Sequence, residues 1–184
     1  MYRMDPVTGE VLDKTILWSG SGYYSDAVML GGELFLMDFF DNRLHVIDPL
    51  EPRLLRTLPV GAINGIRISG GMGALSKPNR LYVADAFGTG VIHEIRPDIG
   101  TVTGTLHTES VRPTALAGIG TRLLYAADWI ANQFESIDRF GEGGRVLSLP
   151  NRIGALGGAV ATGLFADFDE DGDIDLGDFA RFQA

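Results

Sequence analysis

Seven carboxylates lie within twelve residues near the C-terminal end of the sequence. They are Asp167, Asp169, Glu170, Asp171, Asp173, Asp175 and Asp178. With Asp167 as position 1, carboxylates occupy positions 1, 3, 5, 9 and 12, Gly172 provides a bend at position 6, and Asp173 can offer its carbonyl at position 7. Oxygen ligands at this spacing suit a hard cation. The sequence therefore predicts a Ca²⁺ site formed by Asp167, Asp169, Asp171, Asp173, Asp175 and Asp178.

The register of these residues distinguishes the segment from an unstructured acidic tail, which would explain the charge but not the spacing. Ile174 sits at position 8, where loops of the EF-hand type pack an apolar residue. Leu176, Phe179 and Phe182 follow at intervals of three, which predicts one apolar face of a short exit helix.

The segment 167–184 resembles one half of a type I dockerin repeat, which has the same Asp-x-Asp-x-Asp-Gly core. The resemblance implies bound calcium, an extracellular setting and a cohesin-like partner. Two features depart from the family pattern. Only one repeat is present where a cohesin-binding dockerin has two, and Asp178 stands where an EF-hand loop usually has Glu, which predicts weaker calcium binding.

The charge outside this segment is nearly balanced. Of the formal net charge of −9, the seven carboxylates account for −7 and the rest of the chain for −2. No basic surface for nucleic acid is expected. The 184 residues contain no run of 18 apolar residues and no apolar leader after Met1, so neither a membrane span nor a signal peptide is expected in this sequence. There is no cysteine, which excludes disulfides and thiol chemistry but leaves the compartment open.

An internal repeat organises the rest of the chain. The segment 81–100 has two apolar runs separated by turns, and the same pattern recurs at 34–49 and 124–140. The first run ends in each case at an aspartate, and these aspartates, 47 and 43 residues apart, are Asp38, Asp85 and Asp128. A period of this length with four short strands per unit is typical of a propeller blade.

The repeat predicts three complete blades. The first extends from 25 to 60, with strands at 26–30, 34–37, 43–48 and 54–60 and a turn at Gly31-Gly32. The second covers 65–108 and has a longer first turn at 70–78, where a functional loop could grow. The third covers 114–150. Residues 2–6 match 45–49, so the chain enters in the middle of a repeat and continues with an outer strand at 11–17.

The strands at 34–37, 81–84 and 124–127 are apolar on both faces, as expected for sheets stacked between neighbours. The LYVAD and VIDP phrases resemble propellers of the NHL and YVTN repeat type and, more distantly, gluconolactonase-like lactonases. We expect an all-β fold: a partial β-propeller of about three and a half four-stranded blades in residues 1–161, then a calcium loop and short helix in 162–184. We expect the blades to be the C-terminal part of a longer propeller.

Two sets of repeated polar residues have a catalytic and a structural interpretation. His45, His93, Glu135 and Tyr2 share one repeat position, and could form a metal or acid–base site. The position falls on the third strand, away from the axis, which favours a role between blades. The aspartates that end the first run could bind an axial metal, but capping of a tight turn explains why every blade has one.

The predicted function is a calcium-binding extracellular β-propeller module with a binding or structural role. Its partner would be a protein or carbohydrate, with no nucleic acid or membrane span involved. The location implied by the resemblance is secreted or cell-surface. One alternative is a propeller hydrolase of the lactonase-like type. A second is anchoring to a cohesin-like partner through the tail.

Overall fold

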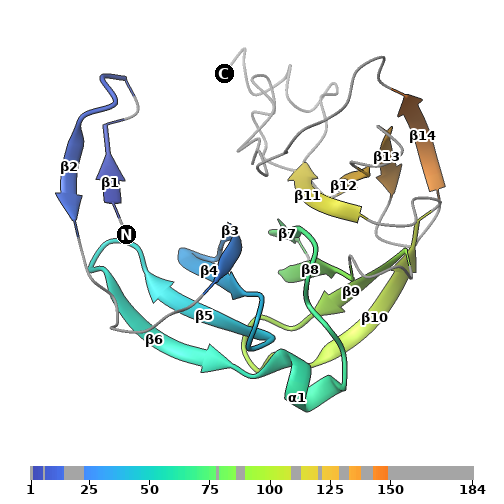
Figure 1. Cartoon of the computed structure of the whole chain (residues 1–184), viewed down its shortest axis with the longest axis horizontal. Coiled ribbons are helices and arrows are strands. Elements are labelled where there is room, and N and C mark those ends of the chain that lie inside the picture. Colours follow the sequence, from blue (N-terminus) through green and yellow to red (C-terminus); the bar gives the residue numbers. More distant parts are fainter. Residues whose placement is uncertain are drawn as a thin grey trace, which may run out of the picture.

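A computed structural model describes residues 2–5, 7–14, 23–77, 79–85, 90–108, 113–119, 122–128, 133–137 and 143–148 of the chain. Antiparallel strands form three four-stranded sheets and one two-stranded sheet. Figure 1 shows these sheets following one another round an arc, with β3, β7 and β11 on the inside and β6, β10 and β14 on the outside. The all-β, partial-propeller prediction is confirmed.

Each four-stranded sheet is a meander in which neighbours in the chain are neighbours in the sheet. Blade 1 consists of β3 (Tyr24–Leu30), β4 (Glu33–Asp38), β5 (Arg43–Asp48) and β6 (Arg53–Leu58). Blade 2 consists of β7 (Met72–Leu75), β8 (Arg80–Ala84), β9 (Val91–Ile95) and β10 (Val102–His107). Blade 3 consists of β11 (Pro113–Ile119), β12 (Arg122–Asp128), β13 (Gln133–Ile137) and β14 (Gly143–Ser148). The two-stranded sheet, called the N-terminal hairpin below, pairs β1 (Tyr2–Met4) with β2 (Val11–Lys14).

The turn between β3 and β4 was predicted from its two glycines and is confirmed. Gly31 and Gly32 have φ angles of 59° and 81°. A two-residue hairpin turn of this type requires positive φ at both positions, which glycine adopts without steric cost. Leu30 and Glu33 are therefore paired on either side of the turn.

The first turn of the second repeat is shorter than the predicted 70–78, although four residues separate β7 from β8 where two separate β3 from β4. Four of the nine residues predicted as a turn form the inner strand β7, Met72–Leu75, which pairs with β8. The connection 59–71 between β6 and β7 is also long. The predicted strand 54–60 also ends early, at Leu58, because Pro59 and Val60 already begin the helix α1 (Val60–Asn64).

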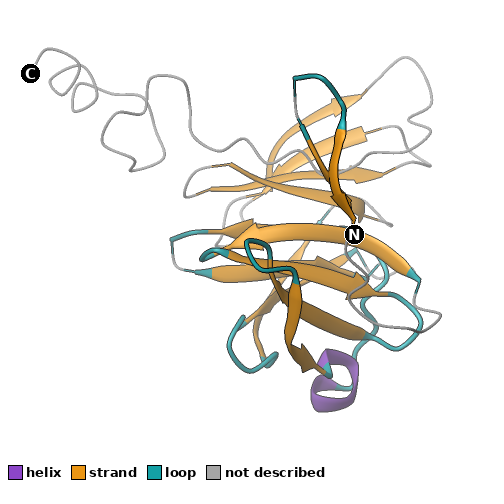
Figure 2. Cartoon of the chain, turned by 90° about the vertical axis from the view of Figure 1, so that its left-hand side faces the viewer, coloured by secondary structure: helices purple, strands orange, loops and turns teal. Residues whose placement is uncertain are grey.

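The connection 59–71 contains α1, Val60–Asn64, the one helix among the described residues (Figure 2). No helix in the described ranges combines the length and apolar character needed to cross a membrane. Side chains fix the connection at both ends. Asn64 donates to the Gly100 carbonyl at 2.8 Å and accepts from the Val102 N–H at 2.9 Å, while Asn42 accepts from the Ile68 N–H at 3.1 Å. The segment is thus a structured link between blades.

The apolar core lies between successive blades. In β8, Leu81 and Val83 belong to a cluster shared with blade 1, whereas Tyr82 and Ala84 belong to a cluster that includes Leu116 of blade 3. These four side chains are fully buried. The prediction that this strand is covered on both faces is confirmed, as stacked blades require.

The inner strands of blades 2 and 3 approach to backbone contact. A Cβ built on Gly71 would overlap the Cα of Ala115, and one built on Gly118 would overlap the carbonyl oxygen of Ala74. The glycines that favoured a loop at 70–78 are therefore required by the close approach of β7 and β11. Asp26 of β3 adds a polar link on the other side, accepting from the Met72 N–H at 2.6 Å. Burial raises the pKa of Asp26, against the effect of the N–H groups of Met72 and Ala27.

Gly118→Ala should destabilise the protein by about 1–3 kcal/mol, because β7 and β11 must separate to admit one methyl group. Gly104→Ala is the matched control: it lies in β10, and its nearest atom, the Glu94 Cβ, is 3.7 Å from the added carbon. Urea unfolding of both variants measures the difference. Equal midpoints for Gly118→Ala, Gly104→Ala and the unmodified protein would contradict the close contact.

Candidate functional site

The predicted calcium ligands lie outside the described residues. They are Asp167, Asp169, Asp171, Asp173, Asp175 and Asp178, together with the predicted exit helix. The calcium site therefore stays a prediction. The described residues contain no group of three or more His, Asp or Glu side chains placed to hold a metal ion.

The shared repeat position falls on the third strand of each sheet, as predicted. His45 lies on β5, His93 on β9 and Glu135 on β13. Each histidine is flanked in register by a fourth-strand threonine, Thr57 for His45 and Thr105 for His93. These side chains come from separate sheets, one per blade, and do not converge on one point.

In blade 1 this position belongs to a polar set formed by Asp38, His45 and Thr57. His45 Nδ1 and Thr57 Oγ1 are hydrogen-bonded at 2.9 Å. His45 Nε2 lies 3.6 Å from Asp38 Oδ2, and both side chains are largely buried. The edge of the Tyr24 ring faces His45, with ring centroids 5.9 Å apart. The set joins β4, β5 and β6 through side chains.

Asp38 also caps the turn after β4. Its Oδ1 accepts hydrogen bonds from the N–H groups of Phe40 at 3.2 Å and Asp41 at 3.3 Å. Asn42 closes the turn with a φ of 50°, and its carbonyl accepts from the Gly61 N–H. The turn-capping prediction is confirmed for Asp38. For Asp85 and Asp128 the following turns, 86–89 and 129–132, lie outside the described residues, so capping there stays a prediction.

In blade 2 the equivalent histidine is more isolated. His93 is buried and shares the face of blade 2 that carries Leu81 and Val83, so it lies between blades 1 and 2 as predicted. Its Nδ1 has no hydrogen-bond partner among the described atoms. Burial lowers the pKa of His93, and the negative charge of Asp85 opposes that shift. Burial of His93 therefore favours the neutral form of the imidazole.

The polar set of blade 1 has the residue types of a hydrolytic triad: a hydroxyl, an imidazole and a carboxylate. Its geometry suits a structural role instead. Asp38 is already engaged by two backbone N–H groups, and the set spans three strands of one sheet. A network of this kind is expected to hold strands in register. In blade 3 the histidine is replaced by Glu135, which is also buried.

An exposed aromatic cluster at one end of blade 1 was missed by the sequence analysis. It consists of Tyr23, Phe39 and Phe40, whose rings meet edge to face with centroids 5.3 to 6.0 Å apart. Tyr23 is 60% exposed and Phe40 72%. The signal was present as two aromatic pairs, at 23–24 and 39–40, whose proximity follows from the pairing of Tyr24 with Asp38.

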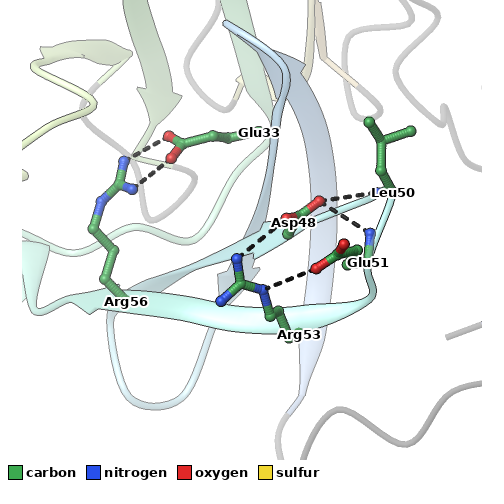
Figure 3. A network of polar contacts seen from close by, with 6 residues as sticks. All are labelled: Glu33, Asp48, Leu50, Glu51, Arg53 and Arg56. Carbon is green, nitrogen blue, oxygen red and sulfur yellow. Dashed lines mark hydrogen bonds and ion pairs between the residues drawn. The ribbon is translucent and has the colours of Figure 1, made fainter.

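Charged side chains lie at the opposite end of the blade 1 sheet (Figure 3). Arg56 forms a bidentate ion pair with Glu33, with both N–O distances 2.6 Å, and also donates to the Pro97 carbonyl of blade 2. Arg56 holds the pKa of Glu33 below its usual value, chiefly by hydrogen bonding. This contact joins β4, β6 and the next blade.

Lowering the pH from 7.5 to 5.5 should destabilise the protein through His93. Because its folded pKa is lowered, the unfolded chain, with a histidine pKa of about 6.5, takes up the proton first, and stability falls as the pH drops below that value. His93→Gln should weaken this pH dependence, whereas His107→Gln, at an exposed site on β10, should not. Urea unfolding at both pH values gives the comparison. The same loss of stability in all three proteins would contradict it.

No family model matches the sequence, and no curated protein matches it. Several solved structures are similar in fold. The chain aligns with the WD40 repeats of RRP9 at 12% identity and a TM-score of 0.58, over 75% of this chain and 42% of that one. It aligns with virginiamycin B lyase from Staphylococcus aureus at 14% identity and a TM-score of 0.56, over 85% of this chain and 52% of that one. It aligns with glutaminyl cyclase from Myxococcus xanthus at 17% identity and a TM-score of 0.61, over 86% of this chain and 71% of that one.

The chain spans about half or less of the length of RRP9 and of the lyase. Identities this low carry no information on activity, because one fold hosts many functions. The alignments extend over three quarters or more of this chain in each case and agree with the stacked antiparallel sheets described above. The chain has a β-propeller fold.

Proposed function

We propose that the chain is an extracellular β-propeller module with a binding or structural role, and that its C-terminal segment folds around one calcium ion. The observation that carries the calcium proposal is the register of carboxylates at alternate positions around Gly172. The propeller supplies the rigid body to which this segment is attached.

The proposed ligands divide into side chains and one carbonyl. Asp173 provides the carbonyl at position 7, as in an EF-hand loop, and the side-chain ligands are Asp167, Asp169, Asp171, Asp175 and Asp178. Seven negative charges within twelve residues repel one another. So short a segment also buries too little apolar surface to offset its loss of conformational entropy. Calcium binding and folding of the segment are therefore coupled.

The proposed affinity supports an extracellular location. Asp178 at position 12 is shorter than the usual Glu, which makes bidentate closure of the shell less favourable. We expect a dissociation constant of about 10⁻⁵ to 10⁻³ M, in the range of extracellular modules. A site of this strength fills at millimolar calcium and stays empty at cytosolic concentrations.

The exposed aromatic cluster supports a binding role for the propeller itself. Aromatic side chains are enriched at the centres of interfaces, and grouped exposed apolar residues mark contact sites more often than scattered ones do. A protein or a carbohydrate could use such a surface. Anchoring to a cohesin-like partner through the tail is an alternative to this role.

Calcium titration by calorimetry should show one site in the intact protein and none in the double variant Asp167→Ala, Asp171→Ala, which loses positions 1 and 5 of the loop. The matched control is Glu10→Ala, Asp13→Ala, which removes the same charge from exposed positions in the N-terminal hairpin region and should bind calcium normally.

Circular dichroism of the intact protein should gain helical signal on calcium addition, because the exit helix forms with the site. Equal heats from the intact protein and the loop variant would refute the site, as would no binding at millimolar calcium.

A further inference from the structure

The exposed aromatic cluster is supported from behind by a series of polar contacts. Asp38 lies beneath it, and its Oδ1 accepts from the N–H groups of Phe40 and Asp41. The other carboxylate oxygen of Asp38 lies 3.6 Å from His45 Nε2. His45 is hydrogen-bonded in turn to Thr57 on the next strand. The turn that carries Phe40 is therefore tied to three strands of blade 1.

The same turn is also held from the side. The Tyr23 carbonyl accepts from the Phe39 N–H at 3.0 Å, which joins the two parts of the cluster through the backbone. Asn42, with a φ of 50°, accepts from the Gly61 N–H through its carbonyl and from the Ile68 N–H through its side chain. Positive φ costs energy in a non-glycine residue and persists where the surroundings hold it. The rings are thus carried by a rigid turn, which reduces the entropy lost when a ligand binds.

An exposed ion pair borders the cluster on the same turn. Asp41 directly follows Phe40, and Arg43 begins β5. Arg43 Nη1 lies 3.8 Å from Asp41 Oδ2, and the two side chains are 50% and 59% exposed. The charge of Asp38 faces His45 and the N–H groups of the turn. The rim of the cluster therefore offers donors and acceptors whose charges cancel, which favours neither a cation nor an anion.

We propose that the aromatic cluster and this ion pair form a binding site for an uncharged saccharide. The face of a pyranose ring carries C–H groups, which are attracted to the negative face of an aromatic ring. Its hydroxyl groups can donate to Asp41 and accept from Arg43, and such polar contacts fix the orientation of a ligand. The inference rests on the binding role proposed above and names the class of ligand for it.

The size of the cluster favours a saccharide over a protein. Three partly exposed rings present on the order of 300 Å², whereas a stable protein interface takes about 800 Å² from each partner. Met29, Leu50 and Leu54 are also exposed, but they lie toward the opposite end of the blade 1 sheet and do not extend the cluster.

The ion pair at the rim distinguishes a saccharide from a covering segment of this chain. A saccharide replaces the water around Asp41 and Arg43 with hydroxyl groups. An apolar segment laid over the cluster would instead remove that water without replacing its hydrogen bonds, and desolvation of charged groups is costly.

The test measures binding of cellotetraose and maltotetraose, whose ring hydroxyl groups are all equatorial and leave C–H groups on both faces. NMR titration of the full chain should show saturable shifts at the amides of residues 23 and 39–41. Phe40→Ala should weaken binding about five- to thirtyfold, the range for a residue at the centre of a site. Leu50→Ala is the matched control and should bind normally, because Leu50 is 85% exposed and follows a capping aspartate, Asp48, at the same distance.

Charged ligands test the neutral character of the site. Tetramethylammonium could bind aromatic rings as a cation, and tetragalacturonate supplies an anionic sugar. Neither should bind as tightly as the neutral tetramers. In Arg43→Gln protein, which leaves the Asp41 charge unbalanced, tetramethylammonium should gain about two- to fivefold relative to the unmodified protein, the range for one exposed ion pair.

The titrations are repeated in EDTA, because the inference does not depend on calcium. Saccharide binding in a protein that binds no calcium would support the site and refute the calcium proposal alone. A calcium-bound protein that binds neither tetramer at millimolar concentration would overturn the saccharide site alone. Tighter binding of a charged ligand, or equal binding by Phe40→Ala, would overturn it too. So would phage-displayed peptides that bind through Phe40 when no saccharide does, since they would indicate a protein partner.

Discussion

The contact between the backbones of β7 and β11 sets the geometry on which the rest of the propeller depends. Sheets that fan out from a centre come closest at their inner strands, so side chains there must be small. Gly71 against Ala115 and Gly118 against Ala74 meet that requirement. Farther out the gap widens, and large buried residues such as Tyr82 fill it. Between blades 2 and 3 this change of residue size produces a wedge, in keeping with the arc of sheets in Figure 1.

The middle strands could be predicted because their signal is local. Residues 81–84 are apolar on both faces and end at an aspartate, which together indicate a doubly covered strand and a capped turn. The strand β7 could not be predicted in the same way. Its glycines indicate a loop by composition, since glycine weakens an isolated strand. Their reason is Ala115, more than forty residues away, and no local pattern in the sequence points to that contact.

In the candidate site, too, the sequence predicted where residues lie but not which atoms they contact. Periodicity placed His45 and His93 on third strands, and the structure agrees. It could not determine which atoms pair. Both histidines have a threonine beside them in register, yet only His45 is hydrogen-bonded to it, and His93 Nδ1 is left without a partner among the described atoms. The acidic loop is a different case, because its calcium site is predicted from the spacing of neighbouring carboxylates alone.

Repetition also changes how polar residues should be interpreted. A residue type that recurs at one position in successive blades meets a need common to all blades, as the capping aspartates illustrate at Asp38. A residue type that changes at such a position cannot serve the same contact. Glu135 in place of His45 cannot offer a second imidazole. Its register partner on the fourth strand differs as well, Val146 in place of Thr57. In a propeller of this kind, we therefore expect the residues specific to this protein's function where one blade differs from the others.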